Sequence, residues 1–579
     1  MPTVAQSSTP ETDWVSRFAD DVIAESERRA PGKPVVVASG LSPSGPIHLG
    51  NLREVMTPHL VADEIRRRGH EVRHLISWDD YDRYRKVPNG VPGIDESWAE
   101  HIGKPLTSVP APAGSAHPNW AEHFKAPMIE ALAELGVEFD GISQTEQYTA
   151  GAYREQILHA MKHRADIDAV LDRYRTKKDP AAKKPKQQKP VDEAELEAAE
   201  GSGAASEDDG TSGGAYYPYK PYCGQCERDL TTVTGYDDET TELTYTCVCG
   251  FSETVHLNEF NRGKLVWKVD WPMRWAYEGV IFEPSGVDHS SPGSSFVVGG
   301  QIVREVFDGV QPIGPMYAFV GISGMAKMSS SKGGVPTAGD ALKIMEAPLL
   351  RWLYARRKPN QSFKIAFDQE IQRLYDEWDK LSTKVADGTV LPADAAAYAR
   401  AIGTAAGELP RTPRPLSYRT LASVADITAG AEDQTLRILS ELDPTDPIAS
   451  LDEVRPRLDR AESWITAYVP ADQRTLVRSE PDTQTLGALG DADRESLRLL
   501  VEGLDSHWSL EGLTTLVYGV PKIQAGLAAD AKPTPELKVA QRTFFALLYQ
   551  LLVGRDTGPR LPTLLLAVGA ERVRKLLGA

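Results

Sequence analysis

A stretch of small and polar residues near the start of the chain is its first candidate for chemistry. From Gly40 to Asn51 it reads Gly-Leu-Ser-Pro-Ser-Gly-Pro-Ile-His-Leu-Gly-Asn. A β-branched run at 35–37 precedes it, and apolar residues at helical spacing follow from Leu52 to Arg68, which predicts strand, tight loop and helix. The free N–H groups at such a helix start form a ready site for phosphate. An ordinary turn between strand and helix is the alternative interpretation.

All four cysteines of the chain gather in one segment, where CxxC is followed by CxC. They are Cys223, Cys226, Cys247 and Cys249. Two thiolate pairs on facing turns complete a tetrahedron around one ion, so this spacing predicts a zinc ribbon. A site with four cysteine ligands keeps no open coordination position, and the zinc would therefore be structural. Four buried thiols without a metal are the alternative.

Acidic residues follow the next predicted strand, at 72–76. Asp79, Asp80 and Asp82 come directly after it. Strand, helix and strand form one βαβ unit, whose ligands bind at the carboxyl ends of the strands. The aspartates and the glycine loop should therefore face one crevice, where a carboxylate would balance a cationic substrate group. A solvated loop or a helix cap is the alternative for any one of these aspartates.

Two later segments complete the set of candidates. Tryptophans at 267, 271 and 275 are dense enough to suggest an aromatic wall for the stem of a substrate side chain, although core packing would explain one or two of them. The loop from Gly321 to Gly334 carries hydroxyl groups and two lysines. Two interpretations are open for it, a flexible phosphate-binding loop and a solvated surface loop. Between these segments we expect strands at 296–298 and 316–320 and a helix at 301–307.

Composition limits the class of protein. At 579 residues the chain should hold several domains. Its start lacks the basic and apolar regions of a signal peptide, and no apolar run approaches the ~20 residues that span a bilayer, so we expect a soluble, cytoplasmic protein with no membrane partner. The formal net charge of −18 argues against a broadly basic nucleic-acid coat but leaves room for a local basic groove.

The first and last of these loops, taken together, resemble the two signatures of class I aminoacyl-tRNA synthetases. His48-Leu49-Gly50-Asn51 is similar to the HIGH signature, and Lys327 to Ser331 is similar to KMSKS, with Ser330 where many families have lysine and Lys332 able to supply the charge. The segments that resemble class I lysyl-tRNA synthetases in particular are 77–82, 269–275, 327–333, 350–354, 357–360, 375–378 and 558–561. The resemblance runs from about residue 13 to the C-terminus and leaves out only 177–214.

The resemblance implies an α/β fold: a Rossmann-type parallel-sheet catalytic domain with a zinc-ribbon insertion, followed by an all-α C-terminal anticodon-binding domain. The expected boundaries are 1–150 for the first half of the catalytic domain, 151–263 for a connective insertion, 264–346 for the second half with its signature loop at 327–331, and 347–579 for the helical region. Within the insertion, 177–214 has low-complexity composition and should be mobile, and 222–250 should form the ribbon.

The resemblance also implies an activity and its residues. Members of this family activate L-lysine with ATP and magnesium, release pyrophosphate and transfer the lysyl group to tRNA(Lys). The expected catalytic residues are His48, Asn51 and Lys327. ATP would be bound by His48, Gly50, Asn51, Lys327, Met328, Ser329, Ser330, Ser331 and Lys332. Lysine would be bound by Gly40, Ser42, Asp79, Asp80, Trp267, Trp271, Asp288 and His289.

One departure and three rival functions remain. A second zinc site of some family members would fall at Pro112, Ala116, His117 and His123, where only the histidines can bind a metal, so we do not expect it.

The rivals are a class I synthetase for another amino acid such as arginine or glutamate, a regulatory or nucleic-acid-binding relative without catalysis, and a nucleotidyltransferase of small metabolites. Intact signature loops disfavour the second, and the large helical C-terminal region disfavours the third. The oligomeric state stays open.

Overall fold

The computed structural model describes residues 13–88, 90–174, 211–212, 215–289, 293–323, 334–528, 531–532 and 534–579. The chain divides into two compact units. The first unit comprises Met1–Leu342, Ala347–Ala366 and Leu381–Leu409, and the second comprises Lys343–Glu346, Phe367–Lys380 and Pro410–Ala579. Within the described ranges, no helix is both long enough and apolar enough to cross a membrane.

A parallel sheet forms the centre of the first unit. Its strands β1 (Val35–Leu41), β2 (Val72–Trp78) and β3 (Asp140–Ser143) pair in the order β1-β2-β3. Beyond β1, a parallel bridge joins Val37 to Phe282, and another joins Phe282 to Ile313. The predicted parallel sheet is therefore confirmed, and it extends further than its three regular strands.

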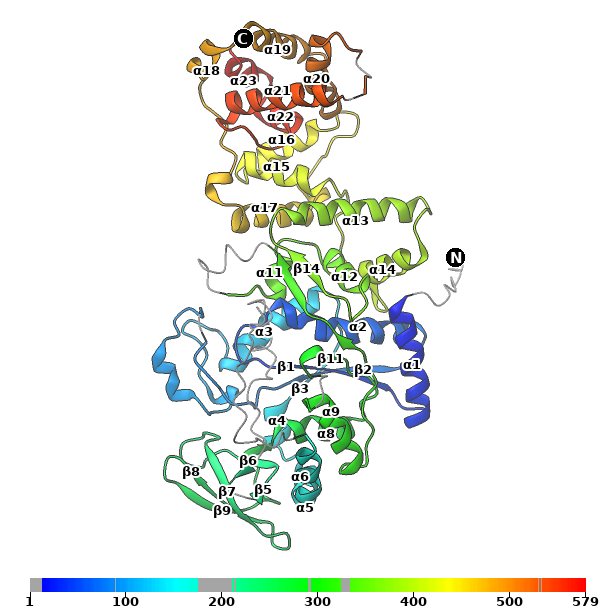
Figure 1. Ribbon diagram of the computed structural model, residues 1–579, viewed down its shortest axis with the longest axis vertical. Helices are drawn as coiled ribbons and strands as arrows, with labels where there is room; N and C mark the ends of the chain where they lie inside the picture. The colour runs from blue at the N-terminus through cyan, green and yellow to red at the C-terminus, as the bar shows by residue number, and fades with distance from the viewer. Residues whose placement is uncertain are drawn as a thin grey trace, which may run out of the picture. The chain divides into compact units, whose positions relative to one another are not determined.

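Successive side chains of a strand point to opposite faces of the sheet, and β1 has buried residues at successive positions. Both faces are therefore covered by helices. Helix α2 (Leu52–Arg67) lies on one side, and α8 (Trp267–Glu278) and α9 (Ser295–Glu305) lie on the other (Figure 1). Val36 and Ala38, which share a face of β1, pack in one apolar cluster with tryptophans of α8 and with Val303 of α9. Helix α1 (Trp14–Arg29) packs against α2.

Shorter elements complete the first unit. Its other helices are α3 (Trp120–Glu134), α4 (Gln144–Thr149), α5 (Arg154–Lys162), α6 (Arg164–Asp172), α11 (Ala338–Leu342), α12 (Ala347–Ala355) and α14 (Pro392–Ile402). Its short strand pairs are β11 (Ser285–Gly286) with β12 (Met316–Tyr317), β13 (Val320–Ser323) with β14 (Phe363–Ala366), and β15 (Gly403–Thr404) with β16 (Gly407–Glu408). Fully buried Arg351 ties three segments together through the carbonyls of Leu135, Arg400 and Gly403.

The cysteine-containing part of the first unit is antiparallel. Strands β7 (Thr231–Tyr236), β8 (Glu242–Cys247) and β9 (Ser252–His256) form one sheet, β6 (Tyr219–Pro221) pairs with β10 (Gly263–Leu265), and β4 (Thr211–Ser212) pairs with β5 (Ala215–Tyr216). Cys223 and Cys226 follow β6, Cys247 ends β8, and Cys249 lies in the turn between β8 and β9.

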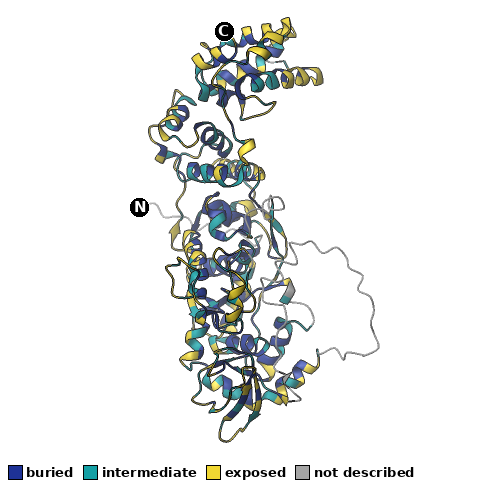
Figure 2. Ribbon diagram, turned by 90° about the vertical axis from the view of Figure 1, so that its left-hand side faces the viewer, coloured by how far each residue is buried: buried dark blue, intermediate teal, exposed yellow. Residues whose placement is uncertain are grey.

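The second unit consists of helices in the part that the structure describes. They are α15 (Tyr418–Thr428), α16 (Glu432–Glu441), α17 (Arg457–Tyr468), α18 (Thr483–Ala488), α19 (Asp491–Gly503), α20 (Leu510–Gln524), α21 (Pro535–Val553), α22 (Leu561–Val568) and α23 (Ala570–Leu576), with the first part of α13 (Glu370–Ala386). Leucines and valines of α19 to α23 form one buried cluster, and the outer faces of these helices are exposed (Figure 2). The predicted helical C-terminal region is confirmed over 410–579, whereas 347–366 and 381–409 belong to the first unit and contain β14, β15 and β16.

The strand predicted at 296–298 is wrong. These residues lie in α9, where Ser295, Val298, Gly299 and Ile302 are buried at the spacing of one helix face. A short apolar run carries no period that separates a buried strand from a buried helix, so its β-branched residues were misleading. The strand predicted at 316–320 is present as two short strands, β12 and β13.

Candidate active site

A cavity opens where β1 and β2 end. The predicted site residues that line it are Gly40, Ser42, His48, Gly50, Asn51, Asp79, Trp267, Trp271 and His289. They come from the glycine loop, the end of β2, helix α8 and the turn after β11, which are far apart in sequence. The cavity therefore joins three of the sequence clusters that could do chemistry, in one unit of the chain.

The first signature loop turns directly into α2. His48 precedes a single 3-10 turn, Leu49–Asn51, and α2 follows from Leu52. Leu49 N–H donates to Pro336 O at 2.8 Å, and His48 forms an antiparallel bridge with Thr337. The second signature segment, Lys327 to Lys332, lies outside the described residues. The chain just after it is thus attached to the first signature.

The three aspartates after β2 already have cationic partners within the protein. Asp79 pairs with Arg274 at 2.9 Å, Asp80 pairs with Lys125 at 3.0 Å, and Asp82 pairs with Lys264. Asp80 is fully buried, also accepts hydrogen bonds from Ser143 and Thr145, and is not among the residues that line the cavity. Of the two aspartates that we expected to bind lysine, the structure therefore places only Asp79 in the cavity.

Arg274 is the only arginine or lysine among the described residues that line the cavity. Its guanidinium donates to Ser77 Oγ at 2.6 Å and forms ion pairs with both Asp79 and Asp270. It also lies 5.2 Å from the ring centroid of Trp267. Because two carboxylates balance this one cation, Arg274 contributes little net positive charge to the cavity.

The tryptophan segment forms an aromatic wall, as the sequence suggested. The rings of Trp267 and Trp271 stack at 5.1 Å, and His289 lies edge-on to Trp271 at 5.7 Å. Trp275, which is also buried, continues the wall. Asp288 belongs to the same turn as His289, but its side chain lies outside the described residues.

Sequence reasoning missed two glutamates of the cavity, Glu54 and Glu283. Glu54 accepts a hydrogen bond from Gly40 N–H at 3.2 Å and one from the Tyr317 hydroxyl at 3.3 Å. Glu283 accepts one from each indole N–H of Trp271 and Trp275, at 3.0 and 2.6 Å. In the sequence, Glu54 resembled an ordinary acidic residue in the first turn of a helix. The helix dipole alone favours a negative charge at that position.

Burial makes these carboxyls unusually weak acids. Burial, with repulsion from Glu283, raises the pKa of Glu54 to about 8, and burial raises the pKa of Glu283 to about 7. The pKa of Asp79 is raised to about 6 by burial, although Arg274 opposes the rise. A cation bound beside these carboxyls would lower their pKa values.

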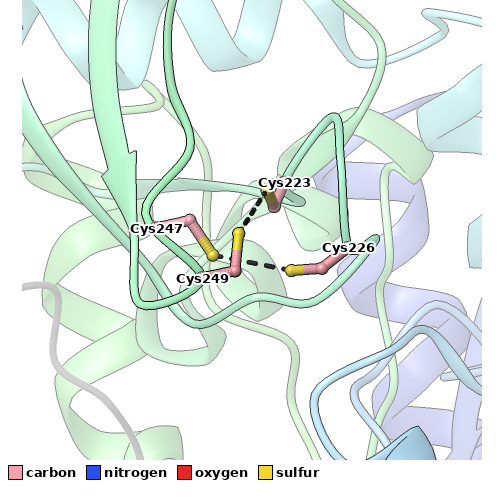
Figure 3. Close-up of side chains that lie close together, drawn as sticks. All are labelled: Cys223, Cys226, Cys247 and Cys249. Carbon is pink, nitrogen blue, oxygen red and sulfur yellow. Dashed lines mark hydrogen bonds between the residues drawn. The ribbon is translucent and has the colours of Figure 1, made fainter.

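The four cysteines meet in one cluster (Figure 3). Their sulfur atoms all lie within 4.8 Å of one another, with 3.7 Å between Cys223 and Cys249 and 3.6 Å between Cys226 and Cys247. Sulfur atoms arranged tetrahedrally around zinc, at bond lengths of about 2.3 Å, lie about 3.8 Å apart. The donor set and its spacing therefore fit one tetrahedral metal ion.

Comparison with known proteins decides the family. The family model "tRNA synthetases class I (K)" matches residues 12–405. The chain belongs to the class I lysyl-tRNA synthetases. It is 81% identical to the lysine--tRNA ligase of Streptomyces coelicolor over all of both chains, and 32% identical to that of Pyrococcus horikoshii over 97% of this chain and 99% of the other. The resemblance found in the sequence is confirmed.

A solved structure gives a weaker likeness. The glutamate tRNA ligase of Elizabethkingia meningosepticum CCUG26117 aligns with 94% of this chain and 99% of its own at a TM-score of 0.40 and 13% identity. These values are too low to carry an argument about the substrate.

Proposed function

We propose that this chain forms lysyl-adenylate from L-lysine and ATP in the cavity at the end of β1 and transfers the lysyl group to tRNA(Lys). The prediction of a lysine--tRNA ligase is confirmed by the family and by the relative that is 81% identical over the full chain. The observation that supports this location is that one cavity collects the first signature loop, Asp79 and the tryptophan wall.

The nucleotide would lie against the first signature. His48, Gly50 and Asn51 line the cavity beside the start of α2, where free N–H groups favour phosphate. Lys327 would bind the β- and γ-phosphates, with Met328, Ser329, Ser330 and Ser331 around them and Lys332 assisting. The attachment of Leu49 to Pro336 supports this role, because it ties the chain after the second signature to the first.

Lysine would occupy the remaining part of the cavity. Gly40 and Ser42 would contact its backbone, Asp79 would face its α-ammonium group, and Trp267, Trp271 and His289 would line its aliphatic stem. Their shared cavity supports this arrangement. Asp288 remains a candidate by its place in the same turn. For Asp80 we propose a supporting role, because Lys125, Ser143 and Thr145 already satisfy its carboxylate.

The chemistry needs positioning and charge stabilisation more than covalent help. The lysine carboxylate attacks the α-phosphorus in line, the bond to the β-phosphate oxygen breaks, and pyrophosphate leaves with the electron pair. His48 and Lys327 would stabilise the negative charge that develops on the phosphates. The ribose hydroxyl of the terminal adenosine of tRNA then attacks the mixed anhydride, and AMP leaves.

Two metals follow from this function. Magnesium would accompany ATP, held mainly by phosphate oxygens and water, since the cysteine cluster is the only group of three or more metal-binding side chains in the described chain. Zinc would be held by Cys223, Cys226, Cys247 and Cys249 in a ribbon at 222–250, and would fix that fold. Metal analysis should find one zinc per chain, lost in Cys226→Ser, whereas a metal-free wild-type chain would contradict the site.

We propose that catalysis and anticodon binding are assigned to different domains, with the boundaries expected from the sequence. Residues 1–150 and 264–346 would form the two halves of the catalytic domain, with the connective insertion 151–263 between them. The helical region 347–579 would bind the anticodon of tRNA(Lys). We propose a cytoplasmic location, where translation takes place.

The direct test is ATP–pyrophosphate exchange with a panel of amino acids, with and without tRNA. Lysine alone should support exchange, and the same protein should charge tRNA(Lys). Exchange with arginine or glutamate in place of lysine would reassign the substrate. A chain that exchanges no amino acid in either condition would contradict the proposed activity.

A further inference from the structure

We propose that Arg53 is a positioning residue for adenylate formation, which holds strand β13 in place beside the first signature. The inference rests on the proposed function, because it concerns the wall of the cavity where ATP would bind. Arg53 is the second residue of α2 and is 2% exposed. It belongs to neither signature and is not among the residues that line the cavity, so it would act through the segments that it contacts.

The first reason is that the guanidinium group of Arg53 bonds both ends of one turn. Its Nη1 donates to Gln361 O at 2.8 Å, and its Nη2 donates to Lys358 O at 2.7 Å. The turn is closed by Gln361 N–H, which donates to Lys358 O at 2.9 Å. The ring of Phe363, where β14 begins, has its centroid 5.2 Å from Arg53 Cζ. Because a guanidinium group presents its N–H donors in a rigid fork, these contacts fix the distance and the orientation of the turn relative to α2.

The second reason is that the same turn is fastened to β13. Pro359 O, in the middle of the turn, accepts a hydrogen bond from Ala318 N–H at 2.9 Å. Ala318 lies two positions before β13. Strand β14, which follows the turn, pairs in parallel with β13 and places Phe363 opposite Val320. The turn and β14 therefore hold β13 just before its start and along its length.

The third reason is that β13 supplies the wall of the cavity beside the first signature. Phe319 and Val320 line the cavity together with Gly50 and Asn51. The carbonyl oxygen of Val320 lies close to Gly50, since a Cβ added to that glycine would lie 3.8 Å from it. A shift of β13 would therefore change the space in which we propose that the nucleotide binds. Arg53 is connected to this space by three steps, from turn to strand to cavity wall.

The chemistry of the side chain argues for more than packing. Burial lowers the pKa of Arg53 to about 10, so the group is still charged at neutral pH, and burying a charge is costly. An apolar side chain could fill the same space without that cost. What it could not supply is the pair of hydrogen bonds to the two carbonyls of the turn, which is the contact that orients β13.

Arg351 of α12 provides a matched contrast within the first unit. It is also fully buried, and it also donates to backbone carbonyls, those of Leu135, Arg400 and Gly403. Neither Arg351 nor any of these three partners lines the cavity. The same kind of buried anchor is thus present at a place where it can affect stability but not the position of the cavity wall.

The experiment measures lysine-dependent pyrophosphate exchange by the full chain at a temperature where each variant is fully folded by circular dichroism. Arg53→Met should lower kcat/KM for ATP by about 100-fold, because a small misplacement of the nucleotide is costly for an in-line attack. Arg53→Lys should lower it by about 10-fold, since an ammonium group keeps the charge but lacks the fork that spans two carbonyls. The KM for lysine should stay within about twofold in both variants. Arg351→Lys is the control and should lower Tm but leave kcat/KM for ATP within about twofold.

Amide hydrogen exchange supplies a readout that does not depend on activity. The N–H groups of Ala318 and of β13 should exchange faster in Arg53→Lys than in wild type, and they should be unchanged in Arg351→Lys. This pattern would locate the effect of Arg53 at the cavity wall, whereas a general loss of stability would raise exchange throughout the first unit.

The outcomes separate this inference from the activity itself. If the wild-type chain is active and Arg53→Lys lowers Tm without changing kcat/KM for ATP, Arg53 is only a structural anchor and the inference fails alone. An equal loss for ATP and lysine would indicate general distortion of the cavity and would also overturn it. If Arg53→Met does not fold, Arg53→Lys decides, and an Arg53→Lys chain that does not fold would assign Arg53 to stability. A wild-type chain that activates no amino acid would contradict the proposed function instead.

Discussion

Two buried charge clusters in this chain are balanced in different ways. In the second unit, Arg457 pairs with Glu346 at 2.8 Å and with Asp379 at 2.8 Å, and Thr412 donates to Glu346 at 2.7 Å. In the first unit, the active-site cavity holds Glu54 and Glu283, which have only neutral donors. The first cluster is complete within the protein, whereas in the described part of the chain neither glutamate of the second cluster has an ion-pair partner.

The difference separates a structural role from a binding role. A complete buried network fixes the helices that contribute to it, and removing one member leaves an uncompensated charge. An incomplete network costs stability in the free protein and gains a partner when a ligand binds. A buried carboxyl without a cationic partner is therefore a better indicator of a cation-binding site than an acidic residue as such. Asp80 and Asp82 are also acidic, but they are already paired.

The largest expected effect is on the complete cluster. Arg457→Met should lower the free energy of unfolding by about 3–5 kcal/mol, because Glu346 is left buried without its partner. Chemical denaturation of the full chain measures this change. Arg437→Met, which removes an exposed i, i+4 pair with Glu441 within α16, should cost less than about 1 kcal/mol. Equal losses in the two variants would contradict a special role for burial.

The next effect concerns rate and not stability. Lys327→Ala should slow lysine-dependent pyrophosphate exchange by about 10²–10³-fold, because one group that stabilises charge on the phosphates is lost. Its thermal unfolding should match wild type, unlike that of Arg457→Met. Lys332→Ala is the matched comparison and should slow exchange less. Unchanged exchange in Lys327→Ala would remove the proposed role of that lysine.

A smaller effect of opposite sign is expected at Glu54. Its pKa in the folded chain is about 8, above the ordinary value of 4.5, so its contribution to stability is full below pH 4.5 and is lost as pH rises through 8. Glu54→Gln cannot ionise and should therefore be more stable than wild type at pH 9, by an amount on the order of a few kcal/mol in thermal or chemical unfolding. A variant that is less stable at pH 9 would indicate a structural role for this carboxylate.

The smallest change is at Gly40. An added Cβ meets Glu54 Oε1 at 3.7 Å, which is ordinary van der Waals contact, and Gly40 lies at the end of regular strand β1. Gly40→Ala should therefore change the free energy of unfolding by less than about 1 kcal/mol. Lysine should bind several-fold more weakly, because the methyl group narrows the cavity at one of the proposed lysine contacts. Unaltered lysine affinity would remove Gly40 from these contacts.

The sequence predicted those parts of the site that are continuous in the chain. The loop from Gly40 to Asn51 contains its own strand end, turn and helix start, so residue types and spacing were sufficient. Trp267 and Trp271 were predicted because tryptophan is rare and was concentrated in one segment. The parallel sheet followed from a β-branched run, a helix and a second strand in order.

The remaining parts depend on contacts between distant segments. Glu283 becomes meaningful only because α8 brings two indole N–H groups to it. Asp80 has the same residue type and sequence neighbourhood as Asp79, and their partners separate their roles. Asp80 is held by Lys125, Ser143 and Thr145, whereas Asp79 pairs with Arg274 in the cavity wall. The run at 296–298 lacked a period to distinguish helix from strand. For Asp80 the deciding partner lies 45 positions away, whereas Glu283 depends on how the chain folds back onto indole groups 12 and 8 positions before it.

The central claim is most directly tested by counting protons when lysine binds. The titratable and charged groups that line the cavity with Glu54 and Glu283 are Asp79, Glu278, Arg274, Tyr153, Tyr317, His48 and His289. Titration calorimetry at pH 7 in two buffers of different ionisation enthalpy should show release of about one proton per lysine, because a bound cation lowers the pKa of the cavity carboxyls and Glu54 is mostly protonated at this pH. The affinity should rise as pH increases from about 6 to 8. Binding that releases no proton and is equally tight across this range would contradict the binding of lysine in this cavity beside its buried carboxyls.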